Sequence, residues 1–131
     1  MASIHDEILV EVHPDRAWDA IRDVGQIHVR LVPGFVTDCR LEDGARIVTF
    51  GNGMQVRELI VDVDDEARRV AWAAVGGQFK HHNASVQVFA EGDGRVRLVW
   101  IADLLPDELA GPIRAMIEQG MVAMKRTLEH A

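Results

Sequence analysis

Cysteine is almost absent from this sequence: Cys39 is the only one among 131 residues. A single cysteine cannot form a disulfide within the chain, which excludes the disulfide-stabilised scaffolds of small secreted proteins and suits a reducing cytoplasm. We expect Cys39 to be a small buried hydrophobic residue, with a regulatory thiol as the alternative. The segment 1–11 also lacks the basic patch and apolar run of a secretion signal, since it carries His5, Asp6 and Glu7. The sequence therefore predicts a cytoplasmic protein.

Long apolar runs and clusters of basic residues are missing as well. No apolar stretch approaches the roughly 20 residues that span a bilayer, so we expect no stable membrane anchor. The 14 basic residues are scattered along the chain, and the 21 acidic residues leave a formal net charge of −7. Because such a chain repels phosphate backbones and anionic lipid surfaces, we expect no nucleic-acid partner.

Motifs for phosphate binding, nucleophilic catalysis and metal binding are also not recognisable. The turn 51–53 is not followed by the Lys-Ser or Lys-Thr pair of a phosphate-binding loop, and Ser85 lacks the glycine-flanked setting of a hydrolase nucleophile. His81 and His82 are adjacent, so on a strand they point to opposite faces and cannot bind the same ion. His28 could approach His82, but no cysteine pair or histidine–carboxylate spacing completes a tetrahedral metal site. The sequence predicts neither a metal nor a cofactor.

What the chain does contain is enough apolar material for one core, with 48% hydrophobic and 27% charged residues. This composition and length predict one domain over residues 1–131. The sequence leaves the oligomeric state open, including a homodimer.

The pattern of apolar residues predicts the order of the secondary-structure elements. Alternation predicts a first strand over 4–12, and helical spacing then predicts a short helix that ends near Gly25 and a further helical turn over 26–31. An apolar stripe predicts a long C-terminal helix over 107–129. Between them, short Gly- and Asp-rich turns predict an antiparallel meander of six strands: 35–42, 45–50, 54–63, 69–75, 81–90 and 95–104.

The side-chain pattern also fixes which residues of the last two strands face each other. One apolar face requires a loop of odd length, and a three-residue loop over 92–94 places Gly94 in the left-handed position. The predicted inward pairs are Val86 with Trp100, Ala84 with Ala102, and His82 with Leu104.

The register of the preceding hairpin is less clear, because Leu59, Val61 and Val63 compete for the inner face. We place Trp72 inside, since a large indole is better buried than exposed. A five-residue loop over 64–68 then sets two pairs, Ile60 with Trp72 and Glu58 with Ala74.

Small residues gather on the predicted inner surface. Four alanines of the sheet face a helix stripe that Gly120 interrupts: Ala74, Ala84, Ala90 and Ala102. Either the helix packs closer to the sheet and fills the gap, or a cavity remains. The pattern alone leaves both outcomes open.

Several motifs resemble those of the START-like superfamily, most closely the bacterial polyketide cyclase/dehydrase and lipid-transport family. These are the segment 58–64, the Gly76-Gly77 turn followed by 82–85, and Val99-Trp100 with Leu105-Pro106 just beyond. The resemblance covers nearly the whole chain. It implies an α+β helix-grip fold, in which a seven-stranded curved antiparallel sheet surrounds the C-terminal helix, with two short helices after the first strand.

The resemblance also implies an internal ligand cavity. In the related abscisic acid receptors, the residues matching Glu58 and Trp72 face the ligand, whereas Ala84 stands where those receptors carry a tyrosine. Hormone recognition is therefore not implied. The ligand-binding residues we predict are Glu58, Ile60, Trp72, His82, Ala84, Val86, Trp100, Met116, Gly120 and Met124.

Two polar residues in this set are candidates for chemistry. Glu58 would lie among apolar side chains, where it could act as a general acid or base, form a buried ion pair with an arginine, or bind a ligand hydroxyl. His82 could orient a ligand or be a satisfied core histidine. Together the two could serve a cyclase across a gap of roughly 10 Å, which corresponds to two strand spacings.

Three functions follow from these expectations. The leading one is binding of a small hydrophobic molecule, lipid-like or aromatic, in the internal cavity. The first alternative is a polyketide cyclase or dehydratase that uses Glu58 and His82, and the sequence leaves open whether the protein is an enzyme. The second alternative is a partner-binding module associated with chaperones, which requires an exposed apolar patch.

Overall fold

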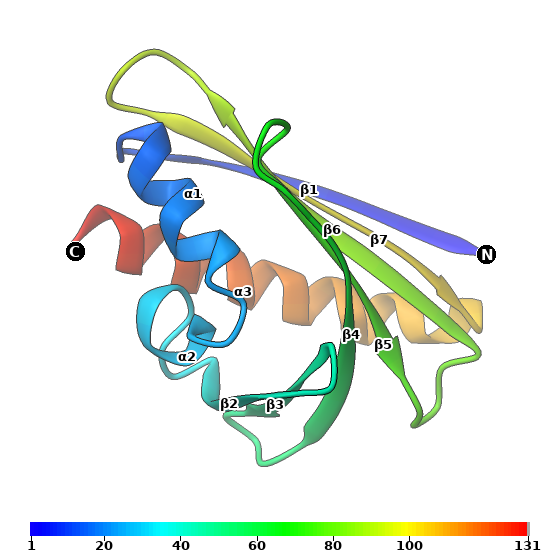
Figure 1. Ribbon diagram of the computed structural model, residues 1–131. Helices are drawn as coiled ribbons and strands as arrows, with labels where there is room; N and C mark the ends of the chain where they lie inside the picture. The colour runs from blue at the N-terminus through cyan, green and yellow to red at the C-terminus, as the bar shows by residue number, and fades with distance from the viewer. Residues whose placement is uncertain (131) are drawn as a thin grey trace.

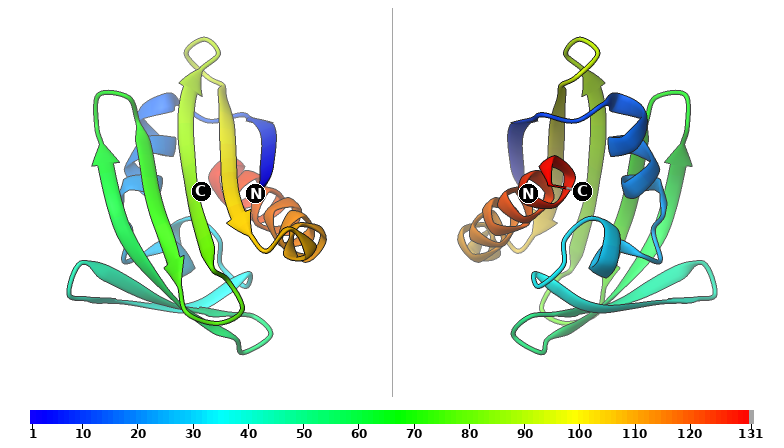
Figure 2. Two further views of the ribbon diagram at one scale, coloured as in Figure 1. Left: turned by 90° about the vertical axis from the view of Figure 1, so that its right-hand side faces the viewer. Right: turned by 90° about the vertical axis from the view of Figure 1, so that its left-hand side faces the viewer.

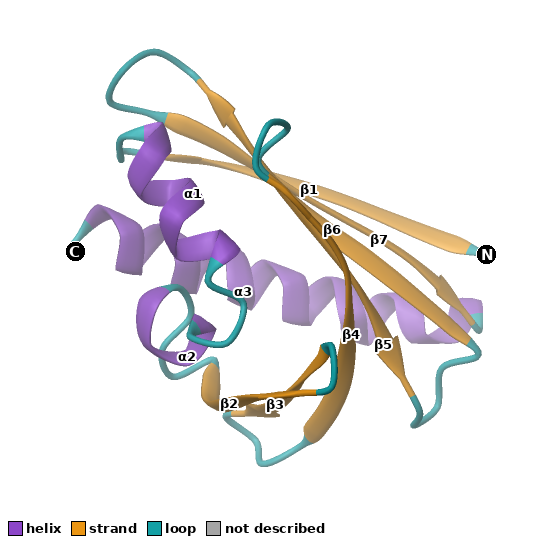
Figure 3. Cartoon of the chain, viewed as in Figure 1, coloured by secondary structure: helices purple, strands orange, loops and turns teal. Residues whose placement is uncertain are grey.

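The computed structural model describes residues 1–130 and contains one antiparallel sheet with the strand order β1-β7-β6-β5-β4-β3-β2 (Figure 1). The strands are β1 Ala2–Val10, β2 Val36–Glu42, β3 Ala45–Phe50, β4 Gln55–Asp64, β5 Arg69–Val75, β6 His81–Ala90 and β7 Val96–Leu105. The helices are α1 Pro14–Arg22, α2 Ile27–Arg30, the 3₁₀ turn η1 Asp107–Leu109 and α3 Ala110–Glu129. Figure 3 shows the same elements coloured by type.

The sheet follows the chain from β2 to β7, as the short turns predicted, and β1 completes it by pairing with β7. The first strand in the sequence and the first strand of the meander, β1 and β2, therefore form opposite edges of the sheet. The sheet curves strongly, so that β2 and β3 cross beneath α3 in Figure 1 while β1 and β7 run above it. The predicted helix-grip architecture is confirmed.

Helix α3 lies along the concave side of the sheet and is roughly 30 Å long at 1.5 Å per residue. Its buried residues follow the predicted stripe, with Ala123 in addition: Ile117, Gly120, Met121, Ala123, Met124 and Leu128. The short helices α1 and α2 lie at one end of the sheet, near the C-terminal half of α3 (Figures 1 and 2). No helix within residues 1–130 has the length and apolar character needed to span a membrane.

Local chemistry explains where α1 begins and what holds it. Pro14 occupies the first helical turn, where its missing N–H costs nothing, and the His13 ring accepts a hydrogen bond from the Asp15 backbone N–H at 3.1 Å. The indole N–H of Trp18 donates to Asp65 Oδ1 at 2.9 Å, which ties α1 to the turn between β4 and β5. Helix α1 is thereby fixed over one end of the interior.

The hairpin of β6 and β7 has the predicted register, with Val86 opposite Trp100 and His82 opposite Leu104. The prediction for the turn was wrong in one respect. Gly92, and not Gly94, has the left-handed backbone, with a φ of 95°. The Glu91 N–H donates to the Arg95 carbonyl at 2.9 Å and closes the three-residue loop, and the first glycine of that loop takes the backbone conformation that glycine adopts without a steric penalty.

The predicted pairs of the β4–β5 hairpin are also present, Ile60 with Trp72 and Glu58 with Ala74. The five-residue loop was wrong, because the ladder starts at Asp64 opposite Arg69 and leaves four loop residues. A β-bulge between Ile60 and Asp62 then shifts the register back. The shorter loop and the bulge compensate, so Trp72 is buried as predicted.

Candidate functional site

A cavity of about 90 Å³ lies between the concave face of the sheet, α3 and the short helices. The sheet provides the widest wall, and every strand from β3 to β7 contributes inward-facing side chains. Those from β3 to β5 are Arg46, Val48, Phe50, Glu58, Val70 and Trp72, and those from β6 and β7 are His82, Ala84, Val86 and Trp100. The interior therefore retains space, which the sequence pattern had left open.

The other walls come from the helices, the segment between α2 and β2, and the first residue of β2. Helix α3 contributes Ile113, Met116, Ile117 and Met124. The end wall consists of Ile21, Ile27, Leu31, Val32, Phe35 and Val36. Sequence reasoning missed this end wall, because contacts between residues 21–36 and strands far along the chain leave no periodic signal.

Two of the predicted ligand-binding residues, Ile60 and Gly120, lie outside the cavity lining. Ile60 is half-buried and packs against the core. At Gly120 the predicted space is already filled, since a Cβ there would lie 2.8 Å from Trp100 Cζ3 and 3.3 Å from Phe35 Cε2. The glycine therefore accommodates the Trp100 ring and does not open room for a ligand.

The alanines of the sheet also contribute less than predicted. Ala84 lines the cavity, whereas Ala74, Ala90 and Ala102 lie outside it. Trp72 and Trp100 contact each other edge to face, with ring centroids 5.8 Å apart and an interplanar angle of 68°. The two indoles form a rigid aromatic part of the wall next to Ala84.

Glu58 is paired with Arg46 inside the protein. The two residues face each other across β3 and β4, and Arg46 Nε lies 2.8 Å from Glu58 Oε1. Arg46 is 5% and Glu58 8% exposed. Arg46 Nη1 also donates to the Val24 carbonyl at 3.3 Å, and its guanidinium carbon lies 5.1 Å from the centre of the Trp72 ring.

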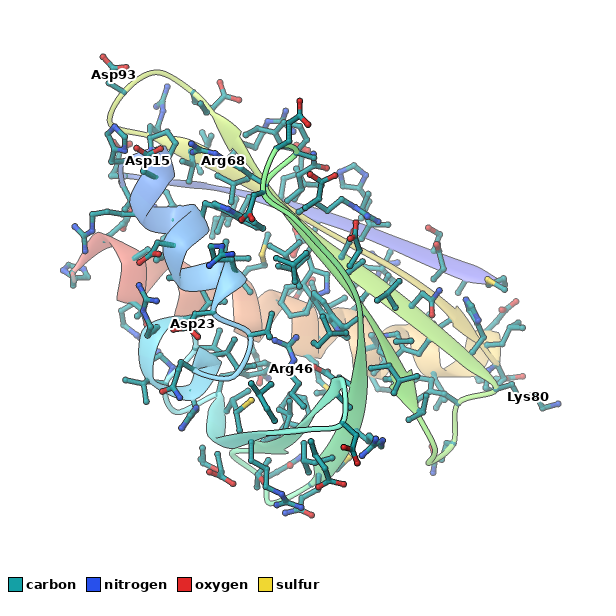
Figure 4. All side chains as sticks on the ribbon, in the orientation of Figure 1. Asp15, Asp23, Arg46, Arg68, Lys80 and Asp93 are labelled. Carbon is teal, nitrogen blue, oxygen red and sulfur yellow. The ribbon has the colours of Figure 1, made fainter. Side chains whose placement is uncertain are left out.

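Figure 4 shows Arg46 in the middle of the molecule, whereas Asp15, Lys80 and Asp93 lie at its periphery. Of the roles considered for Glu58, the structure thus contains the buried ion pair. The Arg46 Nε–H donates a hydrogen bond to one of the two carboxylate oxygens of Glu58. The sequence pattern could have indicated Arg46 as the partner of Glu58. Arg46 alternates with Val48 and Phe50, so it is a charged residue at an inward position of β3.

His82 is the second polar residue predicted for the site, and its ring packs against Phe79 with centroids 4.6 Å apart. Burial, and to a smaller extent the charge of neighbouring His81, lowers the pKa of His82 below its ordinary value. The imidazole is therefore neutral at neutral pH. Its Nδ1 has no hydrogen-bond partner within residues 1–130, and the same holds for Trp100 Nε1.

Two other residues considered in the sequence, His28 and Cys39, lie away from the cavity lining. His28 also has a buried Nδ1 without a partner among residues 1–130, but it does not line the cavity. Cys39 is buried, its Sγ lies 3.6 Å from the Val24 carbonyl oxygen, and burial raises the pKa of its thiol. These features match the predicted role of Cys39 as a core residue.

Several solved structures share this architecture. A START superfamily protein from Mycobacterium smegmatis has a TM-score of 0.73 at 10% identity, covering 96% of this chain and 98% of that one. Norcoclaurine synthase from Thalictrum flavum has a TM-score of 0.71 at 19% identity, covering 99% and 95%. The di-domain ARO/CYC protein BexL of the BE-7585A biosynthetic pathway reaches 0.83 at 16% identity, covering 98% of this chain and 47% of BexL. At these identities the likeness shows a shared fold.

The sequence comparisons are more specific than the structural ones. None of the curated proteins compared with the chain is a significant match. Residues 1–130 match the family described as "Polyketide cyclase / dehydrase and lipid transport". The match spans the same elements that build the sheet, the long helix and the cavity between them. This chain therefore belongs to the polyketide cyclase/dehydrase and lipid-transport family.

Proposed function

We propose that this protein binds a small, mostly apolar molecule in the cavity between its sheet and α3. The observation that carries the proposal is the cavity itself, which three separate parts of the fold enclose with mainly aliphatic and aromatic side chains. Close packing is the rule in protein interiors, so a retained apolar space in a chain of this size is typical of a ligand site.

The size of the cavity limits what it accommodates. An apolar cavity of about 150 Å³ holds one benzene molecule, so a cavity of about 90 Å³ excludes compounds larger than a single ring. A ring enters only if flexible wall side chains such as Met116 and Met124 shift to make room for it. Related proteins support both aromatic and lipid-like ligands. The family description includes lipid transport, and norcoclaurine synthase from Thalictrum flavum was solved with dopamine and hydroxybenzaldehyde.

The cyclase alternative receives partial support from the geometry. Glu58 and His82 line the same cavity, as an acid–base pair would require. Arg46 holds one oxygen of Glu58, however, so only the other oxygen is available for proton transfer. Binding without chemistry is therefore the function that the geometry favours. Unchanged turnover of a poly-β-keto substrate after Glu58→Gln would remove the acid–base mechanism.

The partner-binding alternative predicts an apolar row on β1 and β2. Leu9 on β1 and Leu41 on β2 are exposed by 46% and 63%, but the two strands are opposite edges of the sheet. Leu9 and Leu41 therefore do not join into one patch, and the cavity remains the better candidate site.

A pair of matched substitutions tests the binding function. Ala84→Leu adds a side chain that fills the cavity, whereas Ala73→Leu adds the same atoms on the outer face of the neighbouring strand. We expect the wild-type protein and Ala73→Leu to bind the neutral probe 4-ethyltoluene in a calorimetric titration, and Ala84→Leu to lose most of that binding. Equal binding by all three proteins, or binding by none, would contradict the proposal.

A further inference from the structure

Two nitrogen atoms in the cavity wall, Trp100 Nε1 and His82 Nδ1, have no hydrogen-bond partner within residues 1–130. Leaving a buried polar group unpaired is energetically unfavourable, and buried polar groups in native proteins are nearly always satisfied. In a mostly apolar cavity, two such atoms indicate where the polar groups of an occupant lie. They therefore carry information on the chemistry of the ligand.

The two nitrogens differ in what they accept as a partner. An indole N–H is a donor only, so Trp100 requires an acceptor such as a carbonyl or hydroxyl oxygen. A neutral imidazole has one donor and one acceptor nitrogen, so His82 Nδ1 suits either a carbonyl or a hydroxyl group. Both preferences are met by oxygen functions of an uncharged compound.

The two nitrogens also lie at different levels of the cavity. Trp100 pairs with Val86 and His82 with Leu104, four residues apart along the same two strands, which corresponds to roughly 13 Å. The six-membered ring of Trp100 contacts α3 at Gly120, so the indole extends from the sheet to the helix. One oxygen atom therefore does not serve both nitrogens.

The charges of the wall favour a neutral occupant. Arg46 and Glu58 are the charged residues in the lining, and they cancel each other in an ion pair at 2.8 Å. An additional carboxylate would lie in apolar surroundings without a free cation among the lining residues, and the loss of its hydration would oppose binding. A fatty acid, which carries its charge and all its oxygens at one end, fits this arrangement poorly.

We propose that the ligand is a neutral, single-ring compound with two separated oxygen functions, one bound by Trp100 Nε1 and the other by His82 Nδ1. This inference rests on the proposed binding function and specifies the class of compound bound.

Four probes of nearly equal shape test it. 4-Ethyltoluene has no oxygen, 4-ethylphenol carries the hydroxyl, 4-methylacetophenone carries the carbonyl, and 4-hydroxyacetophenone carries both. Each ligand oxygen that forms a hydrogen bond with Trp100 Nε1 or His82 Nδ1 is expected to raise the affinity by about 5- to 10-fold. 4-Hydroxyacetophenone, which has both oxygens, is therefore expected to bind most tightly. Hexanoic acid, charged and oxygenated at one end only, is expected to bind more weakly than 4-hydroxyacetophenone.

Two substitutions assign the effect to the indole. Trp100→Phe keeps an aromatic wall but removes the N–H, so it is expected to weaken 4-hydroxyacetophenone binding about 5- to 10-fold more than 4-ethyltoluene binding. Trp18→Phe is the matched control, because Trp18 donates to Asp65 and does not line the cavity. It is expected to change the affinity for all four probes by the same factor.

A measurement on the wild-type protein avoids reliance on variants. The three tryptophans give three indole N–H signals in a ¹H–¹⁵N NMR spectrum, and that of Trp18, bonded to Asp65 Oδ1 at 2.9 Å, is an internal reference. We expect 4-hydroxyacetophenone to move the Trp100 signal downfield and 4-ethyltoluene to leave it nearly in place.

The outcomes separate the two proposals. Equal affinities for the four probes, with no downfield shift of Trp100, would mean that water satisfies the nitrogens and would overturn the inference while the binding function stands. Tighter binding of hexanoic acid than of 4-hydroxyacetophenone would overturn the neutral class. If none of the probes binds, the binding function fails and the inference fails with it.

Discussion

Arg46 and Glu58 are direct cross-strand partners whose side chains form a buried ion pair, with 2.8 Å between Nε and Oε1, in the wall of an otherwise apolar cavity. The Trp72 ring lies beside the Arg46 guanidinium, and the Val24 carbonyl accepts one of its remaining hydrogens. The pair places two charges next to the site but leaves its net charge at zero. Stability and ligand selectivity both depend on this arrangement.

Removing one member of the pair is expected to destabilise the protein strongly. Arg46→Met leaves the Glu58 carboxylate buried without its partner, and Glu58→Leu does the same to the guanidinium, so each is expected to lower the free energy of unfolding by about 3–5 kcal/mol. The double variant is expected to lose much less than the sum of the two, because no uncompensated charge remains. Urea unfolding of the four proteins measures these energies.

The exposed pair of Arg57 and Glu42 provides the control. Their side chains lie 3.2 Å apart but are 36% and 48% exposed. Arg57→Met is therefore expected to change the free energy of unfolding by no more than about 1 kcal/mol. A similarly small loss for Arg46→Met, or losses that simply add in the double variant, would show that the buried pair lacks the expected coupling.

The contact between Gly120 and Trp100 leads to a second prediction. A Cβ at position 120 would lie 2.8 Å from the Trp100 ring, so Gly120→Ala is expected to push the indole into the cavity. Overpacking costs about 1–3 kcal/mol, which offsets the gain of roughly 1 kcal/mol that alanine brings to a helix.

Gly111→Ala in the same helix is the matched control, because a Cβ there has no atom within 4 Å. We expect Gly120→Ala to be less stable than Gly111→Ala by about 2 kcal/mol in urea unfolding, and to bind 4-ethyltoluene more weakly. Equal stability of the two variants would mean that the Trp100 ring has room to move.

The parts of the fold that the sequence predicted well are those where alternation continues through both strands of a hairpin. The inward pair of Val86 and Trp100 follows from such a pattern, because a shift by one residue would expose the whole apolar face. In the β4–β5 hairpin the pairing at Trp72 was predicted correctly although the loop length was wrong, because the bulge at Val61 restores the register. Such a bulge has no clear mark in the sequence.

The site was predicted less completely than the fold, for two physical reasons. Parity gives the face on which a side chain lies but not how far it extends, so the filling of the space at Gly120 by Trp100 could not be inferred. The end wall from Ile21 to Val36 depends on long-range packing of α1 and α2. Arg46 is different, since its inward position in β3 was visible from its alternation with Val48 and Phe50.

The burial of His82 predicts a dependence of stability on pH. Because its pKa in the folded protein lies below the ordinary value of 6.5, the unfolded chain binds more protons than the folded one as the pH falls below about 6.5. The contribution of His82 to stability is therefore present above that pH and decreases as the pH falls toward the folded-state pKa. His82→Leu is expected to reduce the loss of unfolding free energy between pH 7 and pH 5.

Ala84→Leu is the comparison variant, because it changes the cavity wall beside His82 without removing a titratable group. It is expected to retain the wild-type slope of unfolding free energy against pH over the same range. If His82→Leu also retains that slope, the His82 ring is accessible to protons in the folded protein, contrary to its position in the cavity wall.

The central claim, that the cavity holds a small neutral molecule, is tested most directly by native mass spectrometry of the protein purified from its own host. We expect part of the wild-type protein to carry one additional compound of low mass, and Ala84→Leu, in which the cavity is filled, to have the mass of the chain alone. Identical spectra for the two proteins, or an acyl lipid retained by both, would contradict the account.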